Sequence, residues 1–282
     1  MRSLKIKNLL ILLAISALLY SMNGCDKISP PYKEKFINTN DTTSKIRKVL
    51  LEEYTGHKCP NCPAASEIAR DLKDIYGEKL IIIAVHAPPG FYTNPQSPNY
   101  TYDFITSTGN ELASTFGIAS WPNGMIDRKK INGNWLIDKD AWGSIIASIA
   151  DSAPNANIKI TNTYNSSTRS LTTSIKTEFL SPLSGTYNLA VYMTEDSIIT
   201  YQDSSGIDIS NYVHRHVLRG AINSTLGDVI SSSGNIAAGD TIVKSYSFPL
   251  DNSWNESHCA VVTFVYDAAT YEIIQAEEQN IQ

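Results

Sequence analysis

The chain has 282 residues, of which 42% are hydrophobic and 18% are charged, and its formal net charge is −5. This length has room for about two domains, and the composition is that of a globular protein. The acidic balance argues against a nucleic-acid-binding protein, which needs a basic face toward the phosphates.

The N-terminus has the layout of an export signal. Basic residues in the first seven positions precede an apolar run over residues 9–19, which is too short to span a bilayer comfortably. The run is followed by Gly24-Cys25, and a small residue directly before a cysteine is typical of a bacterial lipoprotein cleavage site. We therefore expect a signal peptide over residues 1–24 and a lipid on Cys25 that attaches the protein to a membrane. An ordinary signal peptide and an uncleaved anchor are the alternatives.

The segment after the predicted cleavage site is polar. Residues 25–44 show no periodicity, so we expect them to tether the lipid to the first domain. Cleavage would leave 20 Lys and Arg residues against 28 Asp and Glu residues, a net charge of −8, so the expectation of no nucleic-acid partner is unchanged.

The first predicted site is a cysteine pair that follows a strand. Residues 48–54 alternate as in a strand, with Glu53 facing the same side as apolar neighbours. Cys59 and Cys62 follow in a Cys-x-x-Cys spacing, at the start of a helix predicted over residues 63–76. A helix N-terminus favours negative charge and lowers the pKa of a thiol. The pair is therefore typical of thiol–disulfide redox chemistry, and a static disulfide is the alternative.

The next predicted elements surround that pair. Residues 80–85 form a continuous apolar run, typical of a strand buried on both faces, and complete a parallel βαβ unit. A long loop over residues 87–100, rich in proline and aromatic residues, leaves the same edge of the sheet, and we expect it to cover the cysteine pair. The following elements are predicted: a helix over residues 103–116, a strand over 125–128, a hairpin turn at 132–133, an antiparallel return strand over 135–137 and a helix over 139–152.

The pattern changes after residue 154. Polar and apolar residues alternate in short runs that are separated by Ser, Asn, Gly and Pro, and helical periodicity is missing from the sequence. We therefore expect an antiparallel β-sandwich domain over residues 154–282. Its strands are predicted over residues 158–164, 171–179, 187–193, 212–218, 241–248, 260–266 and 271–275.

The element order over about residues 45–153 resembles the thioredoxin fold, an α/β fold with a mixed sheet and flanking helices. Trp121-Pro122 resembles the cis-proline loop of that superfamily, which implies that Pro122 lies against the disulfide and that Trp121 is an auxiliary site residue. In thioredoxins an acid six residues before the first cysteine helps to move the proton of the second one, and Glu53 matches that position. Burial would raise the pKa of Glu53 into a useful range, and a side chain that reaches solvent is the alternative.

The cysteine motif departs from that of thioredoxins. Residues 60–61, which separate the cysteines, are Pro-Asn, and Pro63 favours a helix that begins near Cys62. Such a helix weakens the effect of the helix dipole on Cys59, whereas the positive charge of Lys58 favours a thiolate.

The whole chain resembles the Omp28-related outer-membrane lipoproteins of Bacteroidetes. The resemblance is carried by Cys25, by residues 54–63, by Trp121-Pro122 and by residues 211–219. It implies attachment to the outer membrane, facing the periplasm or the surface, and leaves the chemistry open.

Two histidines near the cysteine pair have open roles. A protonated His57 would stabilise a thiolate or relay a proton, and a solvated turn residue is the alternative. A site made of His57, Cys59, Cys62 and His86 would suit zinc or copper, but no second Cys-x-x-Cys completes the pattern. We expect neither a metal nor a cofactor.

Three further side chains in the second domain are of types that can bind metals or take part in redox reactions. His214 and His216 lie two apart in a predicted strand, hence on one face, where we expect packing or solvent contact rather than a metal. Cys259 lies in an apolar run, so we expect a buried and unreactive thiol. A resolving thiol for the cysteine pair is the alternative.

These observations predict an exported, lipid-anchored thiol–disulfide oxidoreductase that acts on protein thiols or disulfides. Cys59 is expected to be the more exposed, attacking thiol and Cys62 the resolving one, with Pro122 and Glu53 holding and tuning the pair. The alternative is a surface binding lipoprotein in which the thioredoxin-like domain is a scaffold. The sequence names no partner for residues 154–282.

Overall fold

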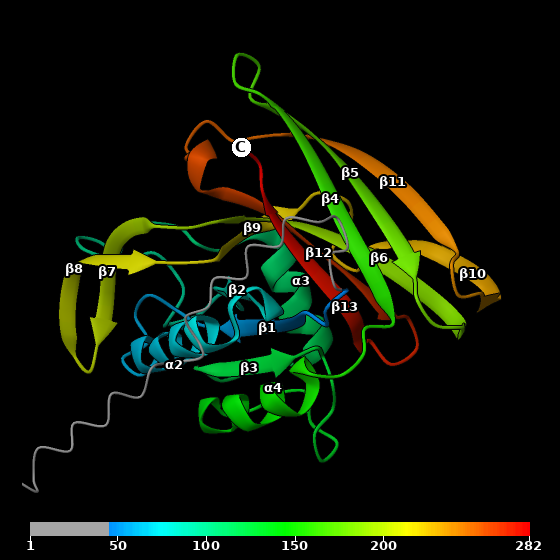
Figure 1. Ribbon diagram of the computed structural model, residues 1–282. Coiled ribbons are helices and arrows are strands. Elements are labelled where there is room, and N and C mark those ends of the chain that lie inside the picture. The colour runs from blue at the N-terminus through cyan, green and yellow to red at the C-terminus, as the bar shows by residue number, and fades with distance from the viewer. Residues whose placement is uncertain (1–44) are drawn as a thin grey trace, which may run out of the picture. The chain divides into compact units, whose positions relative to one another are not determined.

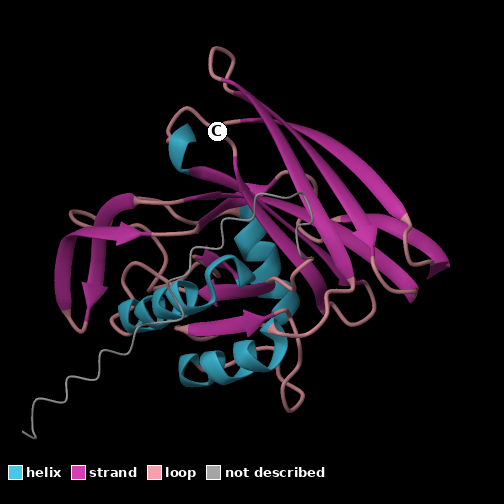
Figure 2. Cartoon of the chain, in the orientation of Figure 1, coloured by secondary structure: helices cyan, strands magenta, loops and turns pink. Residues whose placement is uncertain are grey.

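The structure is a computed structural model that describes residues 45–282, which form one compact unit. The predicted signal peptide, the tether and Cys25 lie outside the described residues. Residues 45–282 are rich in β-structure, with one mixed sheet and few helices (Figures 1 and 2). Within this range no helix combines the length and the apolar character needed to cross a membrane.

The first half of the described chain alternates strands and helices, as predicted. The helix over Ser107–Phe116 shows its end signals clearly. Thr106 caps its start by accepting a hydrogen bond from the amide of Gly109, and Gly117 ends it in a left-handed conformation. The elements are β1 (Val49–Tyr54), α2 (Cys62–Tyr76), β2 (Leu80–Val85), α3 (Ser107–Phe116), β3 (Asn123–Ile126) and α4 (Trp142–Ala150), with short 3₁₀ turns at Gly77–Lys79 and Lys139–Ala141.

The second half consists of strands and one 3₁₀ turn. Its elements are β4 (Ala156–Asn165), β5 (Ser170–Phe179), β6 (Leu183–Glu195), β7 (Ile198–Ser204), β8 (Ile207–His214), β9 (Val217–Ala221), β10 (Asp228–Ile236), β11 (Thr241–Pro249), a turn at Glu256–His258, β12 (Cys259–Asp267) and β13 (Ile273–Asn280).

One eight-stranded sheet runs through both halves. Its order is β13-β12-β6-β9-β2-β1-β3, and β10 pairs with β6. β1 and β2 are parallel, as predicted, and the halves meet where Ala84 of β2 pairs with Val217 of β9. The predicted boundary between residues 153 and 154 stays a prediction, but segments on both sides of it contribute to this sheet.

The three largest buried cores of the described residues lie on the faces of the strands. One core lies between α2, α4 and one face of β1, β2 and β3. A second contains α3 and residues from β1, β2, β3, β6, β12 and β13, so it joins the two halves. A third lies between the three-stranded sheet β11-β5-β4 and strands β6, β10 and β12. β7 and β8 form a separate two-stranded sheet beside α2 (Figure 1).

Several predicted elements differ from the observed ones. The strand predicted over residues 212–218 is broken, because His216 has a left-handed backbone (φ 53°) between β8 and β9. Strands β7 and β10 were not predicted from the sequence. The return strand predicted over residues 135–137 is reduced to a single isolated bridge between Ile137 and Gly124.

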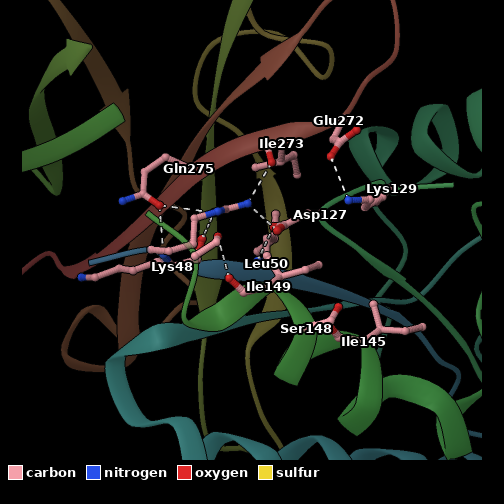
Figure 3. A network of polar contacts seen from close by, with 12 residues as sticks. Lys48, Leu50, Asp127, Lys129, Ile145, Ser148, Ile149, Glu272, Ile273 and Gln275 are labelled. Carbon is pink, nitrogen blue, oxygen red and sulfur yellow. Dashed lines mark hydrogen bonds and ion pairs between the residues drawn. The ribbon is translucent and has the colours of Figure 1, made fainter. Parts of the chain in front are cut away.

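A buried polar network ties β13 to β1 and to the residue that follows β3 (Figure 3). Asp127 accepts hydrogen bonds from the amide of Leu50 and from the Arg47 guanidinium, and its carbonyl accepts one from the amide of Ile273. Gln275 accepts hydrogen bonds from the amide of Lys48, at 2.9 Å, and from Arg47. Burial raises the pKa of Asp127 to about 6, and the charge of Arg47 opposes that rise. The network therefore connects β1 and β13, which are the first and last strands of this sheet in chain order.

Candidate functional site

The cysteine pair lies at the first turn of α2. Cys59 and Cys62 form a disulfide with Cα atoms 5.4 Å apart, and the amide of Cys62 donates to the carbonyl of Cys59 at 3.2 Å. The helix begins at Cys62 because Pro63 fits only a first helical turn. Each cysteine is 1% exposed. In this disulfide Cys59 is therefore no more exposed than Cys62, and the expectation that Cys59 is the more exposed of the two is wrong.

The long loop over residues 87–100 covers the turn that carries the cysteines, as expected. The amide of Lys58 donates to the carbonyl of Tyr92 at 3.0 Å, and the ring of His57 lies 3.3 Å from the carbonyl of Asn94. A Cβ atom on Gly56 would lie 2.6 Å from the Tyr92 carbonyl oxygen, so this position requires glycine.

The β7–β8 hairpin covers the same turn from another direction, which was not predicted. The amides of Asp203 and Ser205 donate to the carbonyls of His57 and Pro60 at 2.8 and 2.9 Å. The buried Gln202 amide donates to the carbonyls of Gly56 and Cys59, both at 3.2 Å. Because more than 140 residues separate the partners, no local pattern could indicate these contacts.

His57 is buried and uncharged. Its ring stacks on Tyr100 with centroids 5.5 Å apart, and burial lowers its pKa to about 4. At neutral pH it therefore supplies no positive charge to a thiolate. The pKa of Lys58 is also lowered by burial, and its ammonium group donates to Gln96 at 3.1 Å.

Two further histidines pack against Phe104. Its ring centroid lies 4.3 Å from that of His86 and 4.6 Å from that of His214, and both ring nitrogens of His86 lack a hydrogen-bond partner. His216 lies outside β8 and β9 and 3.6 Å from Asp196, so His214 and His216 do not share a strand face as expected. Within residues 45–282 no three His, Cys, Asp or Glu side chains are grouped so that they could hold a metal ion.

Glu53 is a buried carboxyl with a strongly raised pKa. It is 3% exposed and accepts a hydrogen bond from Ser66 of α2 at 2.6 Å. Burial raises its pKa to about 7, and the Ser66 hydrogen bond opposes that rise. Glu53 also lines a cavity of about 570 Å³ that lies between α2, the strands β1 and β2, and the β7–β8 hairpin. The chain therefore places beside α2 a group that can exchange a proton near neutral pH.

The raised pKa of Glu53 predicts a specific pH dependence of stability. Glu53 ionises near pH 4.5 when unfolded and near pH 7 when folded. The stability that the uncharged Glu53 carboxyl contributes is therefore fully present below pH 4.5 and is lost as the pH rises through 7. For a 2.5-unit difference, the free energy of unfolding of the wild type should fall by about 3 kcal/mol relative to Glu53→Gln between pH 4 and 8. Urea unfolding across that range measures the difference, with Glu67→Gln on the exposed face of α2 as the control. A difference between wild type and Glu53→Gln that does not change with pH would contradict the prediction.

Trp121 and Pro122 are joined by a cis peptide bond. The Trp121 indole donates to the carbonyl of Ala87 at 2.9 Å, and its ring meets Tyr92 edge-on with centroids 5.8 Å apart. Since Tyr92 accepts the hydrogen bond of the Lys58 amide, the Trp121-Pro122 segment is connected to the cysteine turn through the 87–100 loop.

Cys259 is a free, buried thiol at the start of β12. Burial raises its pKa to about 12. It therefore remains protonated at neutral pH, in line with the expectation of an unreactive side chain.

A buried ion pair beside β1 was not predicted. Arg128 donates to both carboxylate oxygens of Glu52, at 2.7 and 2.8 Å, and is completely buried. Its guanidinium lies over the rings of Phe116 and Phe264, with its central carbon 4.9 and 4.7 Å from their centroids. One signal in the sequence could have indicated this pair. The alternation of β1 places Glu52 on the side opposite Glu53, so one acid lies on each face of the strand, and a buried carboxylate needs a partner.

Comparison with known proteins adds a family and a fold. Residues 109–282 match the family described as "Outer membrane protein Omp28". No curated protein sequence matches the chain.

Among the solved structures that resemble this chain are two from Porphyromonas gingivalis and one from Agrobacterium tumefaciens. HBP35 of Porphyromonas gingivalis is 20% identical, with a TM-score of 0.66 over 84% of this chain and 76% of that one. A structural-genomics protein from Agrobacterium tumefaciens is 13% identical, with a TM-score of 0.50 over 84% of this chain and 96% of that one. A domain of the outer membrane lipoprotein Omp28 from Porphyromonas gingivalis is 20% identical, with a TM-score of 0.32 over 46% of this chain and 91% of that one. The first two likenesses describe the fold alone.

Proposed function

Because the chain belongs to the Omp28 outer membrane protein family, and is therefore a protein of the cell envelope, we propose that it is a lipid-anchored thiol–disulfide oxidoreductase. The working pair is Cys59 and Cys62, and Cys25 carries the lipid. The observation that carries this proposal is the disulfide at the first turn of α2, where helix amides favour a thiolate.

Three further features support a thioredoxin-like site. β1, α2 and β2 form a parallel βαβ unit with the disulfide at its βα junction. The Trp121-Pro122 segment lies directly before β3 and contacts the 87–100 loop, which covers the cysteine turn. Glu53, with a pKa of about 7, is suited to accept the proton of Cys62 and to return it. Glu53 would then move this proton, and Pro122 would be a positioning residue for the pair.

The proposed reaction transfers two electrons between this pair and a partner protein. The reduced Cys59 thiolate attacks one sulfur of a partner disulfide, and the other partner sulfur leaves as a thiolate. The Cys62 thiolate then attacks Cys59, which forms the Cys59–Cys62 bond and releases the first partner sulfur as a thiolate. The partner is reduced and the pair is oxidised; a partner dithiol drives the same steps in reverse.

The burial of both sulfurs favours a second candidate function. Cysteines that are each 1% exposed are also what a structural bridge requires, in a lipoprotein that binds a partner through its β-structure. The reduction potential separates the two candidates, because structural disulfides lie below about −300 mV.

We expect the reduction potential of the Cys59–Cys62 pair to lie between roughly −270 and −120 mV, the range of exchange-active pairs. It is measured on the full-length protein by equilibration against glutathione and dithiothreitol, followed by thiol trapping. A potential below about −300 mV would contradict the proposal and favour the structural bridge. A Cys259→Ala variant is the control, because its pair should have the same potential.

A further inference from the structure

The disulfide is inaccessible as long as the segments that cover the cysteine turn stay in place. Exchange requires a third sulfur to attack one sulfur of the pair, and both are 1% exposed. Two segments cover the cysteine turn: the 87–100 loop and the hairpin. One of them has to move before any partner can react.

The hairpin binds the cysteine turn through backbone amides at its tip. Asp203 lies near the end of β7, and Ser205 lies in the turn that follows, with a φ of 55°. Their amides donate to the carbonyls of His57 and Pro60, which flank Cys59. Binding of this kind uses no side chain of the tip, so another polypeptide backbone can donate to the same carbonyls.

The closed hairpin is poorly packed on the body of the protein. The cavity of about 570 Å³ beneath it is lined by Gln202, Tyr212 and His214 of the hairpin. Both ring nitrogens of the neighbouring His86, and one of His214, are buried without a hydrogen-bond partner. Missing contacts and unpaired polar groups both weaken the closed state, and opening would relieve the second cost.

The two ends of the hairpin have the backbone geometry of hinges. Ser197 precedes β7 with a φ of 60°, and His216 follows β8 with a φ of 53°. Left-handed backbone is uncommon for residues other than glycine, and residues at the ends of elements commonly absorb the rotation of a moving segment. Asp196 spans the hinges, because it pairs with Arg215 at 2.9 Å and lies 3.6 Å from His216.

We propose that the β7–β8 hairpin is a lid that opens at Ser197 and His216, and that backbone amides of a polypeptide partner then bind the exposed carbonyls of His57 and Pro60. The hairpin tip occupies in the closed state the position of the partner backbone. This inference rests on the proposed exchange function, for which it supplies the partner class and the route of access.

The lid is tested by the rate at which a phosphine reduces the disulfide. Asp208 fastens the hairpin by accepting hydrogen bonds from Asn99, at 2.9 Å, and from Tyr100, and Gln202 fastens it to Gly56 and Cys59. The double variant Gln202→Ala/Asp208→Ala should react about tenfold faster than wild type with tris(2-carboxyethyl)phosphine. Asn165→Ala, which removes similar hydrogen bonds from the turn of the β4–β5 hairpin, should leave the rate unchanged. Equal rates for all three proteins would overturn the proposal.

Hydrogen exchange on the wild type keeps the test independent of folding defects in variants. The amides of Asp203 and Ser205 should exchange faster than those of β12, because the lid opens without global unfolding. Equal protection of these amides and of β12 would overturn the proposal.

The partner class is tested with a peptide of residues 200–206 that carries Ser204→Cys as a mixed disulfide with thionitrobenzoate. The Cys59 thiolate of the reduced Cys62→Ser protein attacks the peptide sulfur, and thionitrobenzoate leaves with the electron pair. N-methylation of the peptide at Asp203 and Ser205 should slow this release about tenfold. Equal rates would overturn docking through backbone amides. A reduction potential below about −300 mV would instead show that the exchange function itself is wrong.

Discussion

Arg128→Met is expected to lower the free energy of unfolding by about 3–5 kcal/mol, because it leaves the Glu52 carboxylate buried without its partner. Glu52 is 1% exposed, and both of its carboxylate oxygens accept hydrogen bonds from Arg128. The guanidinium also lies over Phe116 and Phe264, which join the two halves of the chain. The loss should therefore appear in the unfolding of the whole unit, as a lower urea midpoint.

A double variant separates the charge effect from the packing effect. Glu52→Leu/Arg128→Met removes both charges and keeps apolar volume, so it should be more stable than Arg128→Met alone. The rings around position 128 suit a methionine side chain. A double variant as unstable as the sum of the two single variants would mean that Glu52 and Arg128 are not energetically coupled, and would contradict the prediction.

Cys59→Ser is expected to lower the rate of exchange with a peptide mixed disulfide by about a thousandfold or more, because it removes the nucleophile. Cys62→Ser should retain the first step and stop at a mixed disulfide on Cys59, which mass spectrometry detects. The two variants therefore differ in outcome, although each removes the same disulfide.

Cys259→Ala is the matched control for this prediction. It removes the remaining described thiol, which is buried and has a pKa raised to about 12, so the exchange rate should not change. Exchange that survives Cys59→Ser would contradict the assigned roles. The absence of a trapped product with Cys62→Ser would favour a structural bridge.

Local patterns in the sequence predicted the elements that hold the cysteine pair. The alternation of β1, the apolar run of β2 and the proline after Cys62 depend on neighbouring residues, so each could be interpreted without the fold. The burial of Glu53 followed from the same alternation. Its pKa of about 7 required the structure, because desolvation depends on everything packed around the carboxyl.

The covering of the disulfide could not be predicted in that way. The hairpin that buries Cys59 lies more than 140 residues away in the chain, and its strand β7 carries no regular alternation of buried and exposed residues. The left-handed turn at His216 likewise interrupts a segment that alternates as a single strand, and it directs β8 and β9 into different sheets. The neutral state of His57 is another consequence of these distant contacts.

Most strands and helices, the pairing of Cys59 with Cys62 and the burial of Cys259 could be predicted from the sequence, because periodicity, spacing and local apolar context are properties of neighbouring residues. The covering of the disulfide, the pairing of Arg128 with Glu52 and the sheet shared by strands from both halves became known only from the fold. Those features arise from contacts between segments far apart in the chain, and their energies depend on desolvation that no local pattern records.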